Sequence, residues 1–137
     1  MTWEIEDYYC RAEFPDEFCA AMDEIIARLS KRTTQIECGR NRTVFIFKKY
    51  VIKLPRNLDG LIDNDWEGSA ENDIYARAKL VIWKDIPIVL MEKAPFANKK
   101  EIINKLGYYP DWVMSIDCGQ VGFNSKGKLV AFDYGRR

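Results

Sequence analysis

Residues 34–54 decide the fold of this chain, because they read as three short strands in immediate succession. The first strand is Thr34-Gln35-Ile36-Glu37-Cys38, and the second is Thr43-Val44-Phe45-Ile46-Phe47, which is rich in β-branched and aromatic residues. The third is Tyr50-Val51-Ile52-Lys53-Leu54. Between the first two lie Gly39-Arg40-Asn41-Arg42, which are residue types typical of a turn. The stretch therefore predicts consecutive antiparallel strands.

A helix is predicted before these strands, from about Pro15 to Lys31. Pro15 suits the first helical turn, and Asp16 and Glu17 suit the positive end of the helix dipole. Apolar residues then recur at helical spacing and form one stripe, which indicates packing against a core. The residues of this stripe are Phe18, Met22, Ile25, Ile26 and Leu29.

After the third strand, helices and strands alternate. Residues 57–65 are polar and contain Gly60, which predicts a loop, and a helix is expected from about residue 65 to residue 80. The remaining expected elements are two strands (81–83 and 87–92), a short helix (98–106), a helical turn from Pro110 and a final hairpin (121–132). This order predicts an α+β domain in which helices are inserted between antiparallel strands.

The composition suits one folded domain. The 137 residues are 47% hydrophobic and have a formal net charge of +0, so no global field draws the chain to nucleic acid or anionic lipid. The acidic residues 1–7 lack the apolar core of a signal peptide, and no apolar run is long enough to span a bilayer, so we expect a cytoplasmic protein. The absence of histidine excludes Ser-His-Asp catalysis.

Four segments resemble protein-kinase motifs in their order along the chain. Val51-Ile52-Lys53-Leu54 resembles the Val-Ala-Ile-Lys strand, whose lysine reaches the α- and β-phosphates of ATP. Leu90-Met91-Glu92-Lys93-Ala94 resembles the strand that enters the hinge, where backbone groups bind adenine. Gly127-Lys128-Leu129-Val130-Ala131-Phe132-Asp133-Tyr134-Gly135 resembles the strand that leads into Asp-Phe-Gly. The fourth segment is the helix expected between the first two.

In kinases a glutamate of that helix pairs with the strand lysine and fixes its rotamer. The expected helix offers Glu67 and Glu71, and we prefer Glu71 because it lies well inside the predicted helix. The alternative for both is a solvent-exposed acidic face. The alternative for Lys53 is a lysine that simply faces solvent near the end of a strand.

The resemblance implies ATP and magnesium as ligands. Asp133 would hold the metal, and Gln120 would replace the asparagine that holds it in kinases. The residues expected to bind the nucleotide are Lys53, Glu71, Arg40 and Glu92. Arg40 or Arg42 would contribute a side chain to the phosphates in place of a glycine-rich loop, and the alternative is an ordinary hairpin turn with exposed arginines.

The match is weakest at the catalytic base. Ser115-Ile116-Asp117-Cys118-Gly119-Gln120-Val121-Gly122 lies where some kinase-like families carry Asp-x-His-x-Gly-Asn-x-Gly. Aligned on the two glycines, Ser115 falls on the catalytic aspartate, and serine is a poor proton acceptor. A local shift would let Asp117 serve instead, so Asp117 is the candidate catalytic residue.

The expected fold is a single kinase-like domain, with an antiparallel sheet, an inserted helix and a truncated second lobe. Its expected parts are a helical extension (1–33), a nucleotide-lobe-like part (34–93) and the truncated lobe (94–137). The turn with one glycine, the serine in the base position and the short second lobe favour a pseudokinase. Such a protein would act mainly by binding or inhibiting a protein partner, or as a homodimer, with or without bound nucleotide.

Two alternatives remain. One is a minimal ATP-dependent phosphotransferase that uses Lys53, Glu71, Asp117 and Asp133, since positioning and metal charge supply most of the catalysis in phosphoryl transfer. The other is an unrelated α+β domain whose motif order is coincidental. Compact kinase-like proteins of this kind are reminiscent of ones encoded by bacteriophages, which would place the chain in a host cytoplasm. We expect no nucleic-acid or membrane partner, because the short basic pairs are balanced by acidic residues.

Overall fold

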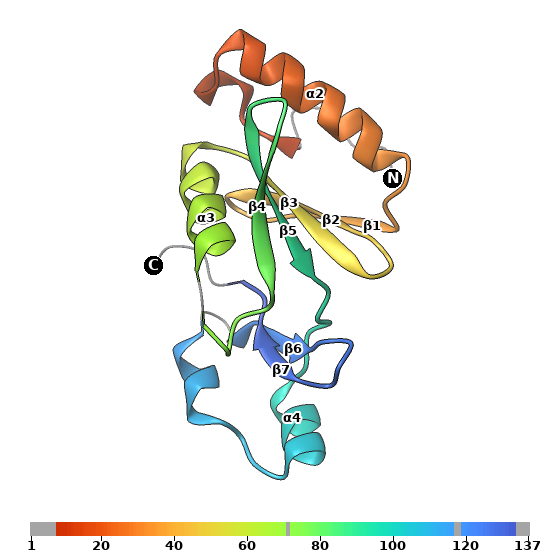
Figure 1. Cartoon of the computed structure of the whole chain (residues 1–137), viewed down its shortest axis with the longest axis vertical. Helices are drawn as coiled ribbons and strands as arrows, with labels where there is room; N and C mark the ends of the chain where they lie inside the picture. Colours follow the sequence, from red (N-terminus) through yellow and green to blue (C-terminus); the bar gives the residue numbers. More distant parts are fainter. Residues whose placement is uncertain (1–7, 71, 117–118, 134–137) are drawn as a thin grey trace.

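The computed structural model describes residues 8–70, 72–116 and 119–133. It is an α+β fold in which a five-stranded antiparallel sheet carries helices before, within and after it (Figure 1). The elements are η1 (Arg11–Glu13), α2 (Asp16–Ser30), β1 (Gln35–Cys38), β2 (Arg42–Ile46), β3 (Tyr50–Pro55), α3 (Leu58–Ser69), β4 (Ala78–Trp83), β5 (Ile86–Glu92), α4 (Lys99–Leu106), η2 (Asp111–Ser115), β6 (Val121–Phe123) and β7 (Leu129–Ala131).

The strands form two sheets. The large sheet has the order β1-β2-β3-β5-β4, and every neighbouring pair in it is antiparallel. β6 and β7 form a separate two-stranded hairpin. The predicted helix near residues 15–31, the three strands of residues 34–54, the short helix near 98–106 and the final hairpin are all confirmed.

The prediction for residues 57–80 is wrong. The polar stretch expected to be a loop forms most of α3, and the helix expected up to residue 80 ends at Ser69. Asn57 starts α3, since its side chain accepts a hydrogen bond from the backbone N–H of Gly60. Gly60 has no room for a Cβ atom, which would lie 2.2 Å from the carbonyl oxygen of Asn41. The last residues of the expected helix, 78–80, instead begin β4, which pairs with β5 along its whole length.

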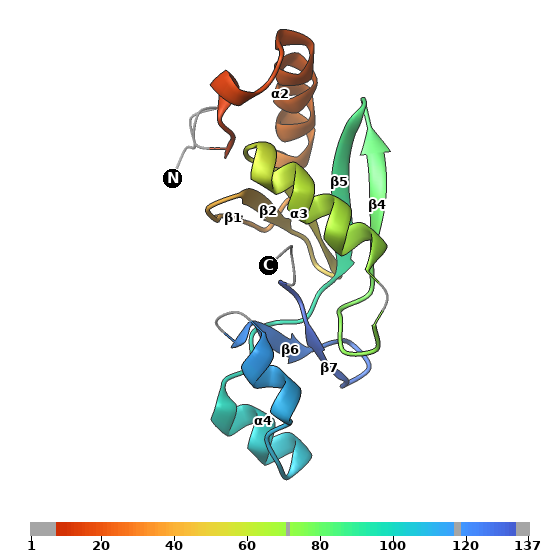
Figure 2. The same ribbon diagram turned by 90° about the vertical axis from the view of Figure 1, so that its left-hand side faces the viewer.

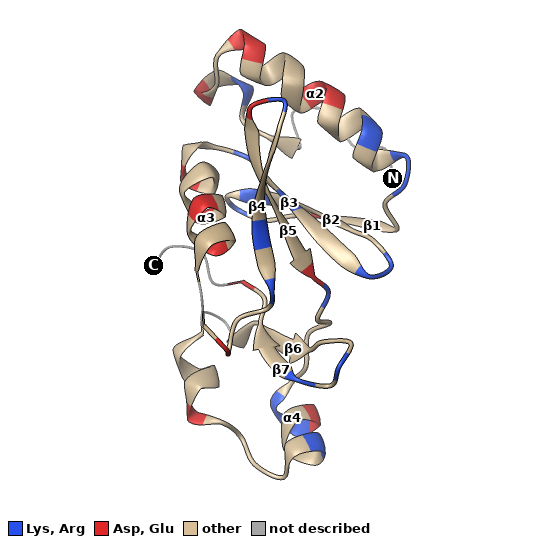
Figure 3. Ribbon diagram, viewed as in Figure 1, with Lys and Arg blue, Asp and Glu red and all other residues tan. Residues whose placement is uncertain are grey.

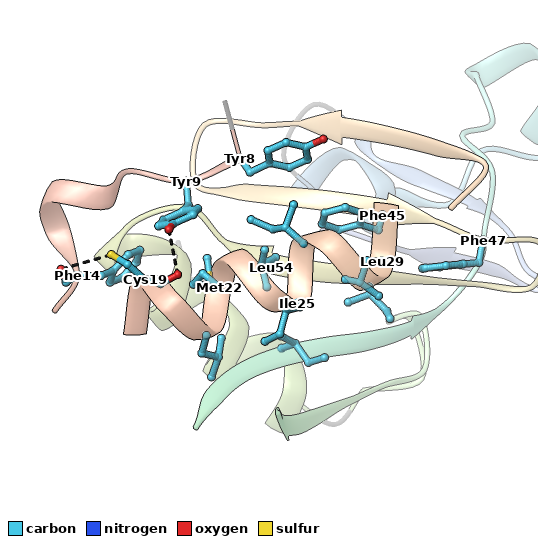
Figure 4. Packing of buried hydrophobic residues seen from close by; sticks show 14 residues of the cluster. Tyr8, Tyr9, Phe14, Cys19, Met22, Ile25, Leu29, Phe45, Phe47 and Leu54 are labelled. Carbon is cyan, nitrogen blue, oxygen red and sulfur yellow. Dashed lines mark hydrogen bonds between the residues drawn. The ribbon is translucent and has the colours of Figure 1, made fainter. Parts of the chain in front are cut away.

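One face of the sheet is covered by α2. The apolar stripe of this helix, which includes Met22 and Ile25, packs on Phe45 of β2 and Leu54 of β3 (Figure 4). Because side chains alternate between the two faces of a strand, Val44 of β2 and its neighbours point to the opposite face. The opposite face of the sheet is therefore not covered by α2 and is available for a site.

A second core lies between the sheet and the C-terminal elements, with α2 and α4 at opposite ends of the molecule (Figure 2). Val89 and Met91 of β5 pack there with residues of α4, η2, β6 and β7. Gly122 of β6 lies so close to the chain after β5 that a Cβ atom would sit 2.1 Å from the carbonyl oxygen of Pro95. This close approach fixes the hairpin against the end of the large sheet.

Acidic and basic residues are interspersed over most of the surface, but α3 carries only acidic ones (Figure 3). None of the helices in the described part of the chain has the length and apolar character needed to span a bilayer.

Candidate functional site

The face of the sheet opposite α2 borders a cleft of about 660 Å³. Such a volume lies within the range of small-molecule sites. The turn between β1 and β2 closes one side of the cleft, and the chain that follows β5 and β7 closes the other. Its apolar lining residues are Val44, Ile46, Val51, Met91, Ala94, Pro95, Phe96 and Phe132, and its charged ones are Glu37, Arg40, Arg42, Lys53, Asp63, Glu92, Lys93 and Asp133.

Strand alternation aims Lys53 into this cleft. Ile52 and Leu54 point from β3 toward α2, so Lys53 between them points to the other face. Its side chain is 5% exposed, and its Nζ atom lies 2.9 Å from Oε1 of Glu67. The same ammonium donates a hydrogen bond to the carbonyl oxygen of Phe132. The expectation that a helix glutamate pairs with Lys53 therefore holds for Glu67.

Glu67 is held from two sides. Its side chain is fully buried on α3, and Arg42 of β2 binds it with both guanidinium ends, Nη1 to Oε1 at 2.6 Å and Nη2 to Oε2 at 2.7 Å. One turn earlier on α3, the amide of Asn64 donates hydrogen bonds to the backbone oxygens of Lys53 and Pro87. These contacts fix α3 to the sheet at the depth of the cleft.

Arg42 also reaches the C-terminal segment. Its Nη2 atom lies 2.7 Å from Oδ1 of Asp133, whose side chain is 42% exposed. Asp133 follows β7, which is anchored by hydrogen bonds between the backbones of Ala131 and of Ile74 and Ala76. Arg42, Lys53, Glu67 and Asp133 thus form one group of alternating charges, which we call the charge cluster.

Burial and charge shift the pKa values of three cluster members. Burial, reinforced by the positive charge of Arg42, lowers the pKa of Lys53, and Glu67 only partly offsets this. Burial would raise the pKa of Glu67, but the charges of Lys53 and Arg42 outweigh it, so that pKa is lowered. Burial would lower the pKa of Arg42, but Glu67 and Asp133 outweigh it and raise that pKa. The cluster therefore keeps the Glu67 carboxylate ionised at neutral pH.

Other expected site residues are placed differently. Glu71 was the glutamate preferred as the partner of Lys53, and the last helical residue of α3 is Ser69. Both Glu71 and Asp117 lie outside the described residues. Ser115 is exposed and its hydroxyl donates to the carbonyl oxygen of Trp112. Gln120 is described but does not line the cleft.

Arg40 and Glu92 do line the cleft. Arg40 is exposed in the turn between β1 and β2, where a long side chain is able to reach a ligand. The carboxylate of Glu92 is engaged elsewhere, because it accepts hydrogen bonds from the backbone N–H of Arg77 at 2.6 Å and from the amide of Asn124 at 3.2 Å. The Glu92 carboxylate is therefore already engaged by the protein.

The kinase resemblance assigns magnesium to Asp133 and Gln120. Magnesium in phosphate sites is held by one or two carboxylates together with phosphate oxygens and waters. Here the Asp133 carboxylate binds the guanidinium of Arg42 instead, and no three acidic or cysteine side chains converge anywhere in residues 8–70, 72–116 and 119–133.

The sequence analysis considered Arg42 as a turn residue, either exposed or reaching a phosphate, and did not predict its contacts with Glu67 and Asp133. One signal was present in the sequence. Arg42, Val44 and Ile46 alternate with Thr43, Phe45 and Phe47, so Arg42 shares the face of Val44 and not that of the core residues. Val44 is also the partner of Lys53 in the strand register.

No protein-family model matches this sequence, and neither the curated proteins nor the solved structures include a significantly similar chain. The kinase resemblance therefore rests on the order of the motifs along the sequence.

Proposed function

We propose that this chain is a kinase-like protein that binds a nucleotide in the cleft and acts by contacting a protein partner, without transferring phosphate. The observation that carries the proposal is Arg42, which holds the carboxylates of Glu67 and Asp133 together at the base of the cleft. A kinase needs the equivalent of Asp133 to hold magnesium.

The arrangement of the cleft supports nucleotide binding. Protein kinases carry their lysine on the third strand and its glutamate on the next helix, and Lys53 of β3 pairs with Glu67 of α3 in the same way. Val44, Val51 and Met91 give an apolar surface for a base beside the chain after β5. Arg40 and Lys53 offer positive charge for phosphates.

The outer face of α3 supports protein binding. Leu58, Ile62 and Trp66 follow one another at four-residue spacing and are 52%, 42% and 50% exposed, so they form one apolar stripe on the helix. Asp59 and Asp65 flank this stripe, and α3 has no basic residue. Charge complementarity favours a partner segment that is an amphipathic helix with basic flanks. Two copies of α3 would instead bring like charges together.

Thermal unfolding tests the nucleotide-binding part. Saturation at about a hundredfold the Kd adds about 2.7 kcal/mol of stability, which raises the midpoint by roughly 5 to 10 °C in a domain of this size. We expect this rise with ADP and ATP. Lys53→Met, which keeps the buried stem without a charge, should reduce the rise. An unchanged midpoint at saturating nucleotide would remove this part of the proposal.

A γ-phosphate transfer assay separates the proposal from its alternative. We expect no turnover of ATP by the wild-type protein. Turnover that disappears in Asp133→Asn would instead establish the minimal phosphotransferase.

A synthetic helical peptide with a leucine stripe and lysine flanks tests the protein-binding part. We expect the peptide to bind the wild-type protein with an affinity that falls as salt is added. The Trp66→Ser variant should lose this binding. The Tyr108→Ser variant is the control, because Tyr108 is exposed on another surface, and it should bind the peptide normally. Sedimentation of the chain alone should give a monomer, and a dimer broken by Trp66→Ser would mean that a second copy occupies α3.

A further inference from the structure

Arg42 lies where two carboxylates need a cation. It bridges Glu67 and Asp133 from the start of β2, and its side chain is 8% exposed. Its register on the sheet is fixed by pairing with Pro55 of β3, and Asn64 lies beside its Nη1 atom. The guanidinium is therefore built into the base of the cleft and is not a mobile surface group.

The charges of the cluster balance without any further ion. Arg42 and Lys53 contribute two positive charges, and Glu67 and Asp133 contribute two negative ones. Without Arg42, the cluster would lose a buried positive charge that contacts both carboxylates, which would favour a bound cation or a proton in its place. Arg42 thus supplies the charge that a metal ion would otherwise bring.

The same balance opposes a divalent cation. Oδ1 of Asp133, the residue expected to hold the metal, accepts a hydrogen bond from Arg42 at 2.7 Å. A divalent ion placed there would have to displace a buried guanidinium or sit against its positive charge. Arg42 itself would then face Glu67 alone, with Lys53 beside it.

We propose that Arg42 replaces the divalent cation of this cleft, so that a nucleoside diphosphate or triphosphate binds without magnesium. Arg42 neutralises the two carboxylates, and the phosphates contact Arg40 and Lys53 directly. Two of the three donors of Lys53 are used by Glu67 and the Phe132 carbonyl, which orients the ammonium. This inference rests on the proposed nucleotide binding, and it adds that the binding is independent of metal.

Two measurements on the wild-type protein test this inference. The first is the midpoint of thermal unfolding with ADP, in EDTA and in millimolar magnesium, where we expect the same rise in both. A rise that vanishes in EDTA would overturn the inference. The second is electron paramagnetic resonance of Mn²⁺, which reports bound metal without any nucleotide. We expect the free-ion signal to keep its full intensity at millimolar protein. Mn²⁺ bound by the wild type and released in Asp133→Asn would overturn the inference as well.

Arg42→Gln is the complementary variant. It should gain Mn²⁺ binding, and its response to ADP should become dependent on magnesium, because Asp133 then lacks its guanidinium. If this variant does not fold, the two measurements on the wild-type protein still test whether nucleotide binding is independent of metal. A failure of ADP to stabilise the wild type under either condition would refute the proposed nucleotide binding, whereas the Mn²⁺ experiment judges the role of Arg42 separately.

Discussion

Replacing Glu67 with glutamine is expected to destabilise the protein severely. Glutamine keeps the shape of the side chain and can accept a hydrogen bond, but it removes the negative charge between Arg42 and Lys53. Both cations remain buried, with side chains 8% and 5% exposed. The half-exposed Asp133 is then the only remaining acidic partner within the charge cluster.

The size of the effect follows from this burial. Removing one partner of a buried ion pair costs about 3–5 kcal/mol, because it leaves an uncompensated charge in a medium that solvates it poorly. At roughly 4 °C per kcal/mol for a domain of this size, the thermal midpoint should fall by roughly 12–20 °C. A natural domain has a total stability of about 5–15 kcal/mol, so part of the population would be unfolded at physiological temperature.

Urea denaturation followed by circular dichroism measures the change, and the chain offers a matched control. Glu24 on α2 also pairs with one arginine, Arg28 at 3.3 Å, and one lysine, Lys84 at 3.1 Å, but all three side chains are substantially exposed. Glu24→Gln should leave the urea midpoint almost unchanged, because solvent screens exposed pairs. Equal midpoints for the Glu67→Gln and Glu24→Gln variants would refute the reasoning that burial makes the cluster important.

Three further outcomes are expected. Since the folded-state pKa of Glu67 is lowered, its contribution to stability should be fully present above the pKa of an unfolded glutamate, about 4.3, and be lost as the pH drops below it. Urea midpoints measured below this pH should therefore fall less steeply in Glu67→Gln than in the wild type. Met22→Ala, at a fully buried site on α2, should cost about 2–5 kcal/mol, whereas Met114→Ala, at an 80% exposed site, should leave the urea midpoint unchanged. Gly122→Ala should lower the free energy of unfolding by about 1–3 kcal/mol or more through overpacking, because its Cβ would lie 2.1 Å from the carbonyl oxygen of Pro95. Gly39→Ala should change the thermal midpoint little, because its Cβ would lie 3.3 Å from the nearest atom, the carbonyl oxygen of Arg42.

Much of the fold was predictable from local pattern. The apolar stripe of α2 and the apolar, β-branched strands of residues 34–54 are signals that each segment carries by itself. The face on which Lys53 lies also follows from alternation along β3. These features need no knowledge of a distant partner.

The helix α3 was not predictable from local sequence pattern. Its buried residues, Gly60, Asn64 and Glu67, do recur at helical spacing, but they are small, polar or charged. They face a backbone carbonyl, two further carbonyls and the Arg42 guanidinium, so the inner face of the helix is polar. Apolar periodicity therefore does not predict such a helix. The apolar residues that it does contain, Leu58, Ile62 and Trp66, lie on its exposed face.

The charge cluster was equally hidden, because its partners are far apart in sequence. Arg42 binds Glu67, which is 25 residues later, and Asp133, which is 91 residues later. Next to Gly39 and Asn41, an arginine has the local appearance of an exposed turn residue. Only the assembled sheet shows that it points inward.

The 91-residue span between Arg42 and Asp133 also bears on how the protein is made. A chain emerging from the ribosome exposes β2, β3 and α3 long before it delivers the segment after β7. During that interval the Arg42–Glu67–Lys53 contacts can form, but the fourth member of the cluster is still missing. The cleft is therefore completed only after the segment that follows β7 has been made, later than the sheet on which it is built.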